Sequence, residues 1–232
     1  SHGDKVVELP PGFERVGGRV VGKRVTHIRP EDNDFLQLFE EIESTRPDVV
    51  FATYSGREAV EFVGAYSAAG LAGRIPLAAS AFAVDDSLLP ELGDAAAGIW
   101  NCFSWARRLA SDENQLFVDA FETVTGRPVD AYALLGYDAA RLVSQLAVAT
   151  GGELRRADHL RLAGGQLGGS SPRGQLILGD ANQGMVSPLY LRQVQKQNGR
   201  LINVVVEQLP VSPAPAEEMR VKSGWLNPYL CA

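Results

Sequence analysis

The sequence predicts an α/β fold built on a parallel sheet, and three observations support this prediction. Short apolar runs alternate with helical patterns between residues 48 and 138, which favours parallel strands joined by right-handed crossovers. Polar and aromatic residues collect where these runs end, and open parallel sheets bind ligands at the carboxyl ends of their strands. The chain has 232 residues and 45% hydrophobic content, which suits a globular core.

The first expected strand covers residues 19–27, and a helix capped by Asn33 or Asp34 follows it. Its apolar residues have the spacing of one helical face; they are Phe35, Leu38, Phe39 and Ile42. We expect this helix to end at Pro47, because the residue before a proline avoids helical angles.

The next elements alternate regularly. Residues 48–53 form an expected strand, and a helix with Val60, Val63 and Ser67 on one side ends at Gly70. A strand at residues 75–80, a short helix at residues 88–92 and a strand at residues 98–104 follow.

Two longer helices come next, at residues 112–125 and 132–149, each closed by glycine. The pattern then changes to β structure. Gly164, Gly168 and Gly169 indicate a flexible loop, residues 174–179 a short strand and residues 180–184 a turn. An Asn-Gly pair at 198–199 separates β-rich runs at residues 189–195 and 201–209, which predicts a hairpin.

Composition and motifs exclude several classes of protein. The net charge of −6 argues against a nucleic-acid-binding protein. The sequence has no run of about 18 apolar residues, no phosphate-binding loop or dinucleotide fingerprint, and no nucleophile elbow. The three histidines, His2, His27 and His159, are expected to be solvated rather than catalytic. We therefore expect neither a metal nor another cofactor.

Two cysteines, Cys102 and Cys231, are too few for a structural zinc cluster. They could form one disulfide, which would favour an oxidising compartment, or remain two unrelated thiols. No signal peptide is visible, but mature secreted proteins have lost theirs.

Hydroxyl and aromatic residues follow three consecutive predicted strands: Tyr54 and Ser55, then Ser80, Ala81 and Phe82, then Ser104 and Trp105. Aromatic surfaces with a few hydroxyl groups are typical of a small-molecule pocket. The alternative for each residue is turn chemistry, with the aromatic rings covering the edge of the sheet.

Several segments resemble one family when they are taken in order: residues 12–21, 34–35 with 46–51, 56–60 with 69–71, 75–77 with 93–98, and 132–140. Together they resemble the type I periplasmic binding proteins, in the leucine/isoleucine/valine-binding branch of ABC transporter receptors. The resemblance covers nearly the whole chain. It implies a two-lobed periplasmic-binding-protein-like fold with parallel sheets flanked by helices, here without the amino-terminal part of the first lobe.

The same resemblance divides the chain into three parts. Residues 1–103 form the second lobe, residues 104–191 the returning part of the first lobe, and residues 192–232 a hairpin and tail that return to the second lobe. Both cysteines would then lie in the second lobe, which makes a disulfide between Cys102 and Cys231 more plausible.

The resemblance also assigns roles to the candidate site. It places Tyr54 and Ser55 on the second-lobe loop that faces the ligand, and matches Tyr132 to an aromatic residue that packs on the ligand from the first lobe. Residues 80–82 fall where branched-chain receptors carry a carboxylate for the ligand ammonium. This segment has no acid, and the nearest are Asp85 and Asp86. An aromatic or other apolar carboxylate therefore competes with an amino acid as the expected ligand.

The implied function is binding without catalysis. Two lobes close on a ligand in the periplasm, and an ABC permease in the membrane recognises the closed form. Two alternatives stay open: a ligand-sensing regulator of the same fold, and an α/β enzyme whose catalytic groups lie outside this chain.

Overall fold

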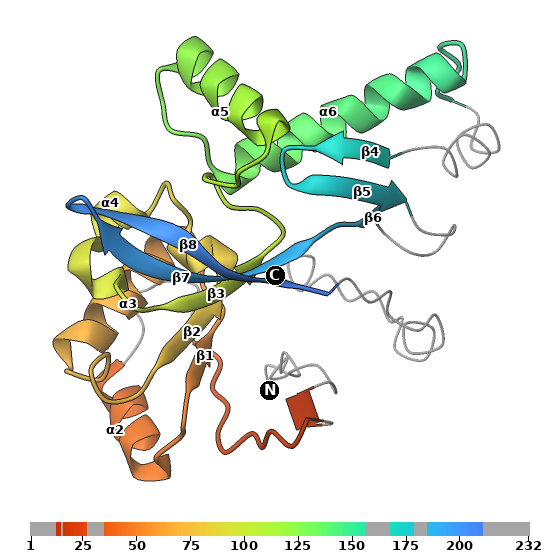
Figure 1. Cartoon of the computed structure of the whole chain (residues 1–232). Coiled ribbons are helices and arrows are strands. Elements are labelled where there is room, and N and C mark those ends of the chain that lie inside the picture. Colours follow the sequence, from red (N-terminus) through yellow and green to blue (C-terminus); the bar gives the residue numbers. More distant parts are fainter. Residues whose placement is uncertain (1–12, 15, 27–34, 156–167, 179–184, 211–232) are drawn as a thin grey trace.

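The computed structural model describes residues 13–14, 16–26, 35–155, 168–178 and 185–210. Their elements form two groups. We call residues 35–103 and 189–209 the five-stranded body, and the described residues between 104 and 186 the three-stranded body. Figure 1 shows the three-stranded body, with helices α5 and α6, above the five-stranded body.

The larger sheet has the strand order β1-β2-β3-β7-β8. Its strands are β1 (Val50–Ala52), β2 (Leu77–Ser80), β3 (Trp100–Phe103), β7 (Leu189–Gln197) and β8 (Arg200–Leu209). The first three strands are parallel, as predicted, and β7 joins the sheet antiparallel to β3. The predicted hairpin is confirmed, because β7 and β8 pair across Asn198 and Gly199, whose φ angles are 50° and 76°.

Helices α2 (Phe35–Thr45), α3 (Gly56–Ala68) and α4 (Leu89–Leu92), with short 3-10 turns at Ala81–Val84 and Gly93–Ala96, complete this body. Helix α3 buries Ala59, Phe62, Val63 and Tyr66. The predicted face is confirmed in part, because Val63 is buried, Val60 packs partly buried against the same core and Ser67 is half-buried. Aromatic packing adds to this face, since the ring of Phe39 contacts those of both Phe62 and Tyr66.

Helices α5 (Asp112–Thr125) and α6 (Ala131–Ala149) begin the three-stranded body and confirm the predicted spans to within one residue. The Ser111 hydroxyl accepts a bond from the backbone N–H of Asn114, and Gly126 ends α5 in the left-handed region. An antiparallel sheet follows, made of β4 (Gly168–Ser171), β5 (Gly174–Leu178) and β6 (Met185–Val186). Its buried apolar cluster consists of Trp105, Phe117, Val129 and Leu134.

Two sequence predictions are corrected here. Residues 19–26 contain no strand, because no strand in the described part of the chain supplies the hydrogen bonds that would form one. Gly168 and Gly169 begin β4 rather than a loop, since they pair with Ile177 and Leu176 of β5. The expected cap at residues 33–34 and the turn at 180–184 lie outside the described residues. No helix in the described part of the chain is long and apolar enough to cross a membrane.

Candidate ligand-binding site

The parallel register places the carboxyl ends of β1, β2 and β3 at one edge of the larger sheet. Val50 pairs with Leu77 and Ala78 pairs with Trp100, so the three strands end nearly level. The residues that follow these strands include most of those predicted to bind a ligand.

Tyr54 is held firmly at the end of β1. Its backbone carbonyl accepts a 2.7 Å hydrogen bond from the Ser80 hydroxyl, which joins the ends of β1 and β2. Its phenol shares a 3.0 Å hydrogen bond with the Thr26 hydroxyl, and its ring lies 4.6 Å from that of Phe62. Burial raises the pKa of the Tyr54 phenol, against a smaller lowering by the bond to Thr26, so this side chain stays a neutral hydrogen-bonding group.

A pocket of about 330 Å³ opens at this edge of the sheet. Six residues line it: Thr53, Tyr54, Ser55, Ser80, Phe82 and Tyr132. Their side chains are aromatic rings and hydroxyl groups, which is the lining typical of small-molecule sites. Five of the six come from the ends of β1 and β2, while Tyr132 comes from the first turn of α6 in the other body.

Three aromatic rings pack together where the two bodies meet, and two of them, Phe82 and Tyr132, line the pocket. The ring of Phe82 lies 5.3 Å from that of Tyr132 and 5.7 Å from that of Phe103. Such distances suit edge or tilted contacts between rings, which contribute about 0.5–1.5 kcal/mol each beyond their buried area. Tyr132 remains 57% exposed, so much of its surface faces open space.

Two predicted ligand-binding residues do not line this pocket. Trp105 is fully buried in the core of the three-stranded body, where its indole N–H donates a 2.7 Å bond to the Asn114 side chain. Ala81 is buried in the 3-10 turn between Ser80 and Phe82. Sequence reasoning missed Thr53. It ends the predicted strand at residues 48–53, directly before the chosen Tyr54, and this position was the available signal.

The two nearest acids have structural partners of their own. Asp85 accepts bonds from the Ser87 backbone and hydroxyl and from the Ala131 backbone. The buried Asp86 carboxylate lies near Arg192 and Asn203, and burial raises its pKa. Neither acid lines the pocket.

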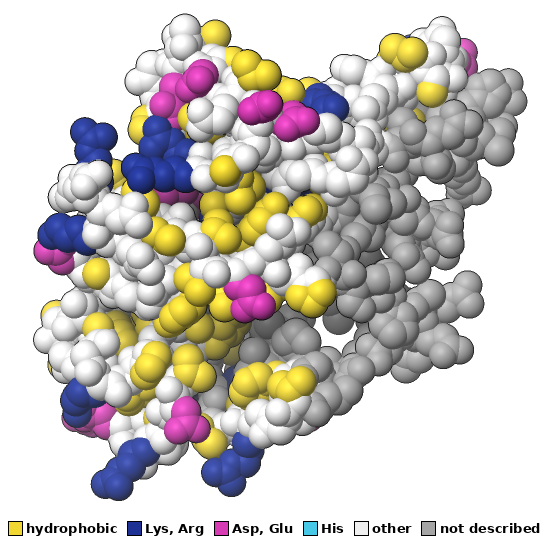
Figure 2. Space-filling model, in the orientation of Figure 1, with side chains coloured by type: hydrophobic (Ala, Val, Ile, Leu, Met, Phe, Trp, Pro, Cys, Tyr) yellow, Lys and Arg dark blue, Asp and Glu magenta, His cyan; other side chains and the backbone are white. Residues whose placement is uncertain are grey.

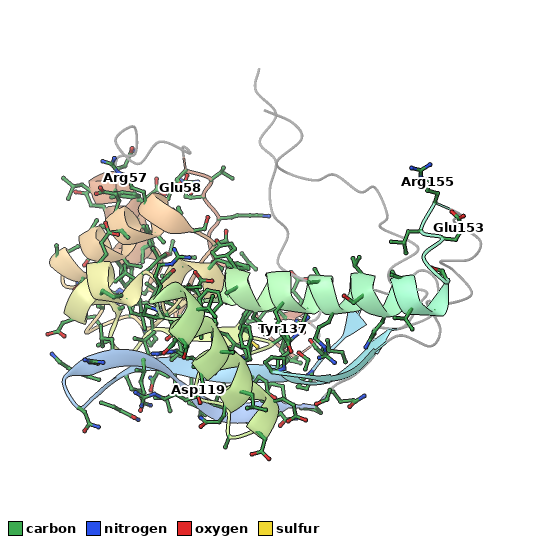
Figure 3. The ribbon with its side chains drawn as sticks, turned by 90° about the horizontal axis from the view of Figure 1, so that it is seen from above. Arg57, Glu58, Asp119, Tyr137, Glu153 and Arg155 are labelled. Atoms are coloured by element: carbon green, nitrogen blue, oxygen red, sulfur yellow. The ribbon has the colours of Figure 1, made fainter. Side chains whose placement is uncertain are left out.

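The amino-terminal end of α3 also reaches the pocket. Ser55 is the residue that caps this helix, and its hydroxyl makes no capping hydrogen bond. Exposed first-turn N–H groups carry partial positive charge, which favours an anionic ligand group nearby. Arg57 and Glu58 occupy this turn (Figure 3), and burial raises the pKa of the Glu58 carboxyl.

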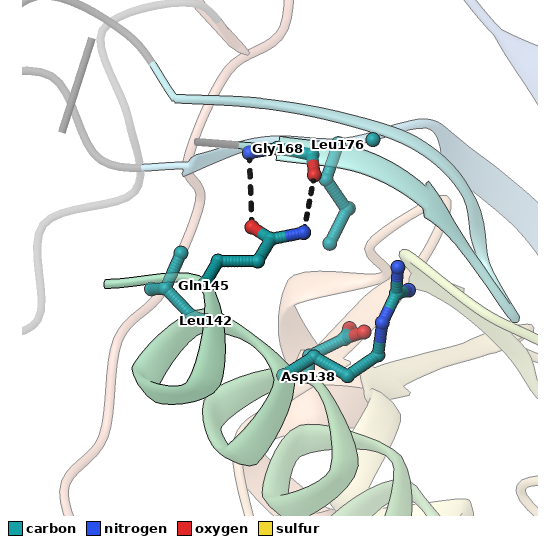
Figure 4. A pocket seen from close by; sticks show the side chains of 7 residues that line it. Asp138, Leu142, Gln145, Gly168 and Leu176 are labelled. Atoms are coloured by element: carbon teal, nitrogen blue, oxygen red, sulfur yellow. Dashed lines mark hydrogen bonds between the residues drawn. The ribbon is translucent and has the colours of Figure 1, made fainter. Parts of the chain in front are cut away.

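A second, much smaller cavity of about 10 Å³ lies between α6 and the three-stranded sheet (Figure 4). There Gln145 bonds both the N–H and the carbonyl of Gly168, at 3.4 and 3.0 Å. A space of this size holds at most one water molecule, so we assign it to packing rather than to ligand binding.

Cys102 lies half-buried on β3, and burial raises the pKa of its thiol. Cys231 lies outside the described residues, so the disulfide between them stays a prediction. No group of three metal-ligating side chains occurs in the residues that the structure describes.

The fold and the site therefore define a two-body α/β protein with a candidate small-molecule pocket between the bodies. The sequence profile of the periplasmic binding protein family matches residues 12–200, and the chain belongs to this family. A curated relative, Leu/Ile/Val-binding protein homolog 6 of Brucella melitensis, is 30% identical over 188 residues. The match covers 79% of this chain and 47% of the relative, so the chain spans about half the length of that protein.

Solved structures of solute-binding proteins from ABC transporters are also similar to this chain. The ABC transporter substrate-binding protein of Sphaerobacter thermophilus is 30% identical, with a TM-score of 0.79 over 86% of this chain and 54% of that one. An ABC transporter solute binding protein of R. palustris in complex with 4-hydroxybenzoate is 29% identical, with a TM-score of 0.77 over 87% of this chain and 55% of that one. Another from R. palustris, in complex with benzoate, is 30% identical, with a TM-score of 0.73 over 87% and 54%.

Proposed function

We propose that this chain forms part of an extracytoplasmic solute-binding component of an ABC transporter, and that it binds a small carboxylate between its two bodies. The pocket built from the ends of β1 and β2 and closed by Tyr132 of α6 carries this proposal. The pocket needs no reactive side-chain pair for this role, and we expect binding without turnover.

An aromatic carboxylate is the favoured ligand. Phe82 and Tyr132 offer two neighbouring aromatic surfaces, and an aromatic ring gains about 0.5–1.5 kcal/mol from each such contact. An α-amino acid also requires a partner for its ammonium group, because an unpaired buried charge is costly. Asp85 and Asp86, the acids closest in sequence to Phe82, are both engaged elsewhere. Benzoate and 4-hydroxybenzoate, bound by two similar proteins, are the natural probes.

Binding would proceed through closure. A ligand that contacts Tyr54 and Phe82 on one body and Tyr132 on the other stabilises the closed arrangement through its higher affinity for that arrangement. An ABC permease is the partner that would recognise the closed form.

Calorimetric titration of the full-length protein that contains this chain tests the proposal. We expect benzoate or 4-hydroxybenzoate to bind more tightly than leucine. Tyr132→Ala and Tyr54→Ala should each weaken binding about 10-fold or more, since buried aromatic contacts often dominate binding.

Tyr137→Ala is the matched control, because it removes a tyrosine from the same helix at a position that does not line the pocket. Unchanged affinity in both Tyr54→Ala and Tyr132→Ala would exclude this site. Conversion of a bound probe into product would exclude a role in binding alone.

A further inference from the structure

One carboxylate joins the two bodies away from the chain segments that connect them. Asp85 ends the 3-10 turn Ala81–Val84 of the five-stranded body and is only 4% exposed. Its Oδ2 atom accepts a 3.2 Å hydrogen bond from the backbone N–H of Ala131, the first residue of α6. Other bonds between the bodies, such as those from the Tyr190 hydroxyl to the Arg173 carbonyl and from the Arg192 guanidinium to the Trp105 carbonyl, involve residues close to the crossovers themselves.

The other oxygen of the same carboxylate is fixed locally. Oδ1 accepts a 3.0 Å bond from the Ser87 N–H and a 2.7 Å bond from the Ser87 hydroxyl. The carboxylate is therefore oriented by its own body before it reaches α6. A carboxylate at a helix amino terminus is also stabilised by the helix dipole, typically by about 0.3–1 kcal/mol.

The residue after Ala131 is Tyr132, the pocket residue contributed by the three-stranded body. Asp85 and Phe82 lie within the same short segment of the five-stranded body, three residues apart. The hydrogen bond from Asp85 to Ala131 and the ring contact from Phe82 to Tyr132 therefore join the same two segments side by side.

We propose that Asp85 is a positioning residue for the ligand pocket: its carboxylate holds the amino terminus of α6 so that Tyr132 stays beside Phe82 and the two rings face the bound ligand together. This inference rests on the proposed function, because it uses the same pocket. Asp85 does not touch the ligand. It acts by reducing the freedom that Tyr132 must lose when a ligand binds, which increases affinity through preorganisation.

A double-mutant cycle on the full-length protein tests this coupling, with 4-hydroxybenzoate as the probe. We expect Asp85→Ala to weaken binding about tenfold. Combined with Tyr132→Ala, it should add little further loss, because its effect passes through that tyrosine. Equal losses in the presence and absence of Tyr132 would overturn the proposal.

Asp130→Ala is the matched control. Asp130 caps the same helix by accepting a 2.8 Å bond from the Ala133 N–H, so its removal weakens the same terminus without breaking the bond to Asp85. We expect this variant to lower the melting temperature and to keep the affinity within about twofold. A loss of affinity equal to that of Asp85→Ala would reduce the effect to general weakening of α6 and overturn the proposal.

A ligand-free measurement separates this inference from the proposed function. Nuclear Overhauser contacts between the Phe82 and Tyr132 rings should be present in the wild type and in Asp130→Ala, and lost in Asp85→Ala. Asp85→Leu, which keeps a similar side-chain shape but has no acceptor oxygen, replaces Asp85→Ala if that variant does not fold. Ring contacts that persist in the Asp85 variant would overturn the positioning role. If the wild type binds none of the probes, the proposed function fails while this measurement still decides the role of Asp85.

Discussion

The two bodies of this protein bury their apolar residues to very different degrees. The five-stranded body has a continuous core in which α2, α3 and α4 cover the sheet, with Ala59, Val84 and Val194 fully buried. The three-stranded body buries a cluster of four residues, while Val124 and Val148 on its helices are 84% and 85% exposed. Figure 2 shows hydrophobic side chains at the surface of both regions, including the middle of the face.

This difference predicts unequal stability. Apolar burial is the main favourable term in folding, at about 25 cal/mol per Å², so a body with little of it opens more easily. The pocket is lined by residues from both the more stable and the less stable body. Tyr54 and Ser80 lie on the well-packed body, and Tyr132 lies on the body with less buried apolar surface.

Loss of the Trp105 side chain should have the largest effect on the difference in stability between the two bodies. Trp105→Ala removes a fully buried ring from the small cluster and leaves the Asn114 amide oxygen without its donor. We expect a loss of about 3–5 kcal/mol in the free energy of unfolding of the three-stranded body. Hydrogen exchange of α5 and α6, followed by mass spectrometry, measures it.

Trp100→Ala, at a half-buried tryptophan of β3, is the control and should cost less. Equal losses of protection in both bodies after Trp105→Ala would mean that the molecule unfolds as one unit.

Asp86 should make the stability of the five-stranded body depend on pH. Burial raises its pKa, and its Oδ2 atom has no hydrogen-bond partner among the described residues. The folded protein therefore holds this proton more tightly than the unfolded chain does. The stabilisation is greatest below the ordinary carboxyl pKa of about 4 and is lost as the pH rises through the raised value.

Denaturant unfolding at several pH values, for the wild type and Asp86→Asn, measures this contribution. We expect the stability difference between variant and wild type to shift in favour of the variant as the pH rises. An equal dependence of the unfolding free energy on pH in the two proteins would contradict this prediction.

A matched pair of glycines gives the smallest effect. Gly64 in α3 and Gly136 in α6 both lie inside helices, and a Cβ atom added at either position would meet nothing within 4 Å. Alanine at each should stabilise its own helix by about 0.5–1 kcal/mol.

If the bodies unfold separately, Gly136→Ala should raise the melting temperature of the first transition and Gly64→Ala that of the second. Differential scanning calorimetry resolves the two. A single transition that both variants shift equally would refute separate unfolding.

Local signals predicted much of this fold. Helices α5 and α6 were found because helical patterns end at glycines, at Gly126 and at the pair Gly151 and Gly152. The β7–β8 hairpin was found because the Asn-Gly turn requires positive φ angles. The expected strand at residues 19–27 was wrong in its described part, since strand formation depends on a neighbour that sequence alone does not show.

The candidate site was predicted in outline for a similar reason. Parallel topology brings strand ends together, so the residues after β1 and β2 were identifiable from the sequence. Trp105 follows the same rule in sequence but turns into the core, because Asn114 supplies a buried partner for its indole N–H. The bond from Asp85 to Ala131 spans 46 residues, and no local pattern marks it.

Strands β3 and β7 are neighbours in the larger sheet, and Phe103 pairs directly with Tyr190. The chain thus leaves the five-stranded body and re-enters it at adjacent positions, about 5 Å apart. In topological terms, residues 104–188 are an insertion into a single hairpin. Changes in the length or content of this insertion need not disturb the register of the sheet that carries Tyr54 and Ser80. One half of the binding surface can therefore diversify while the other is preserved.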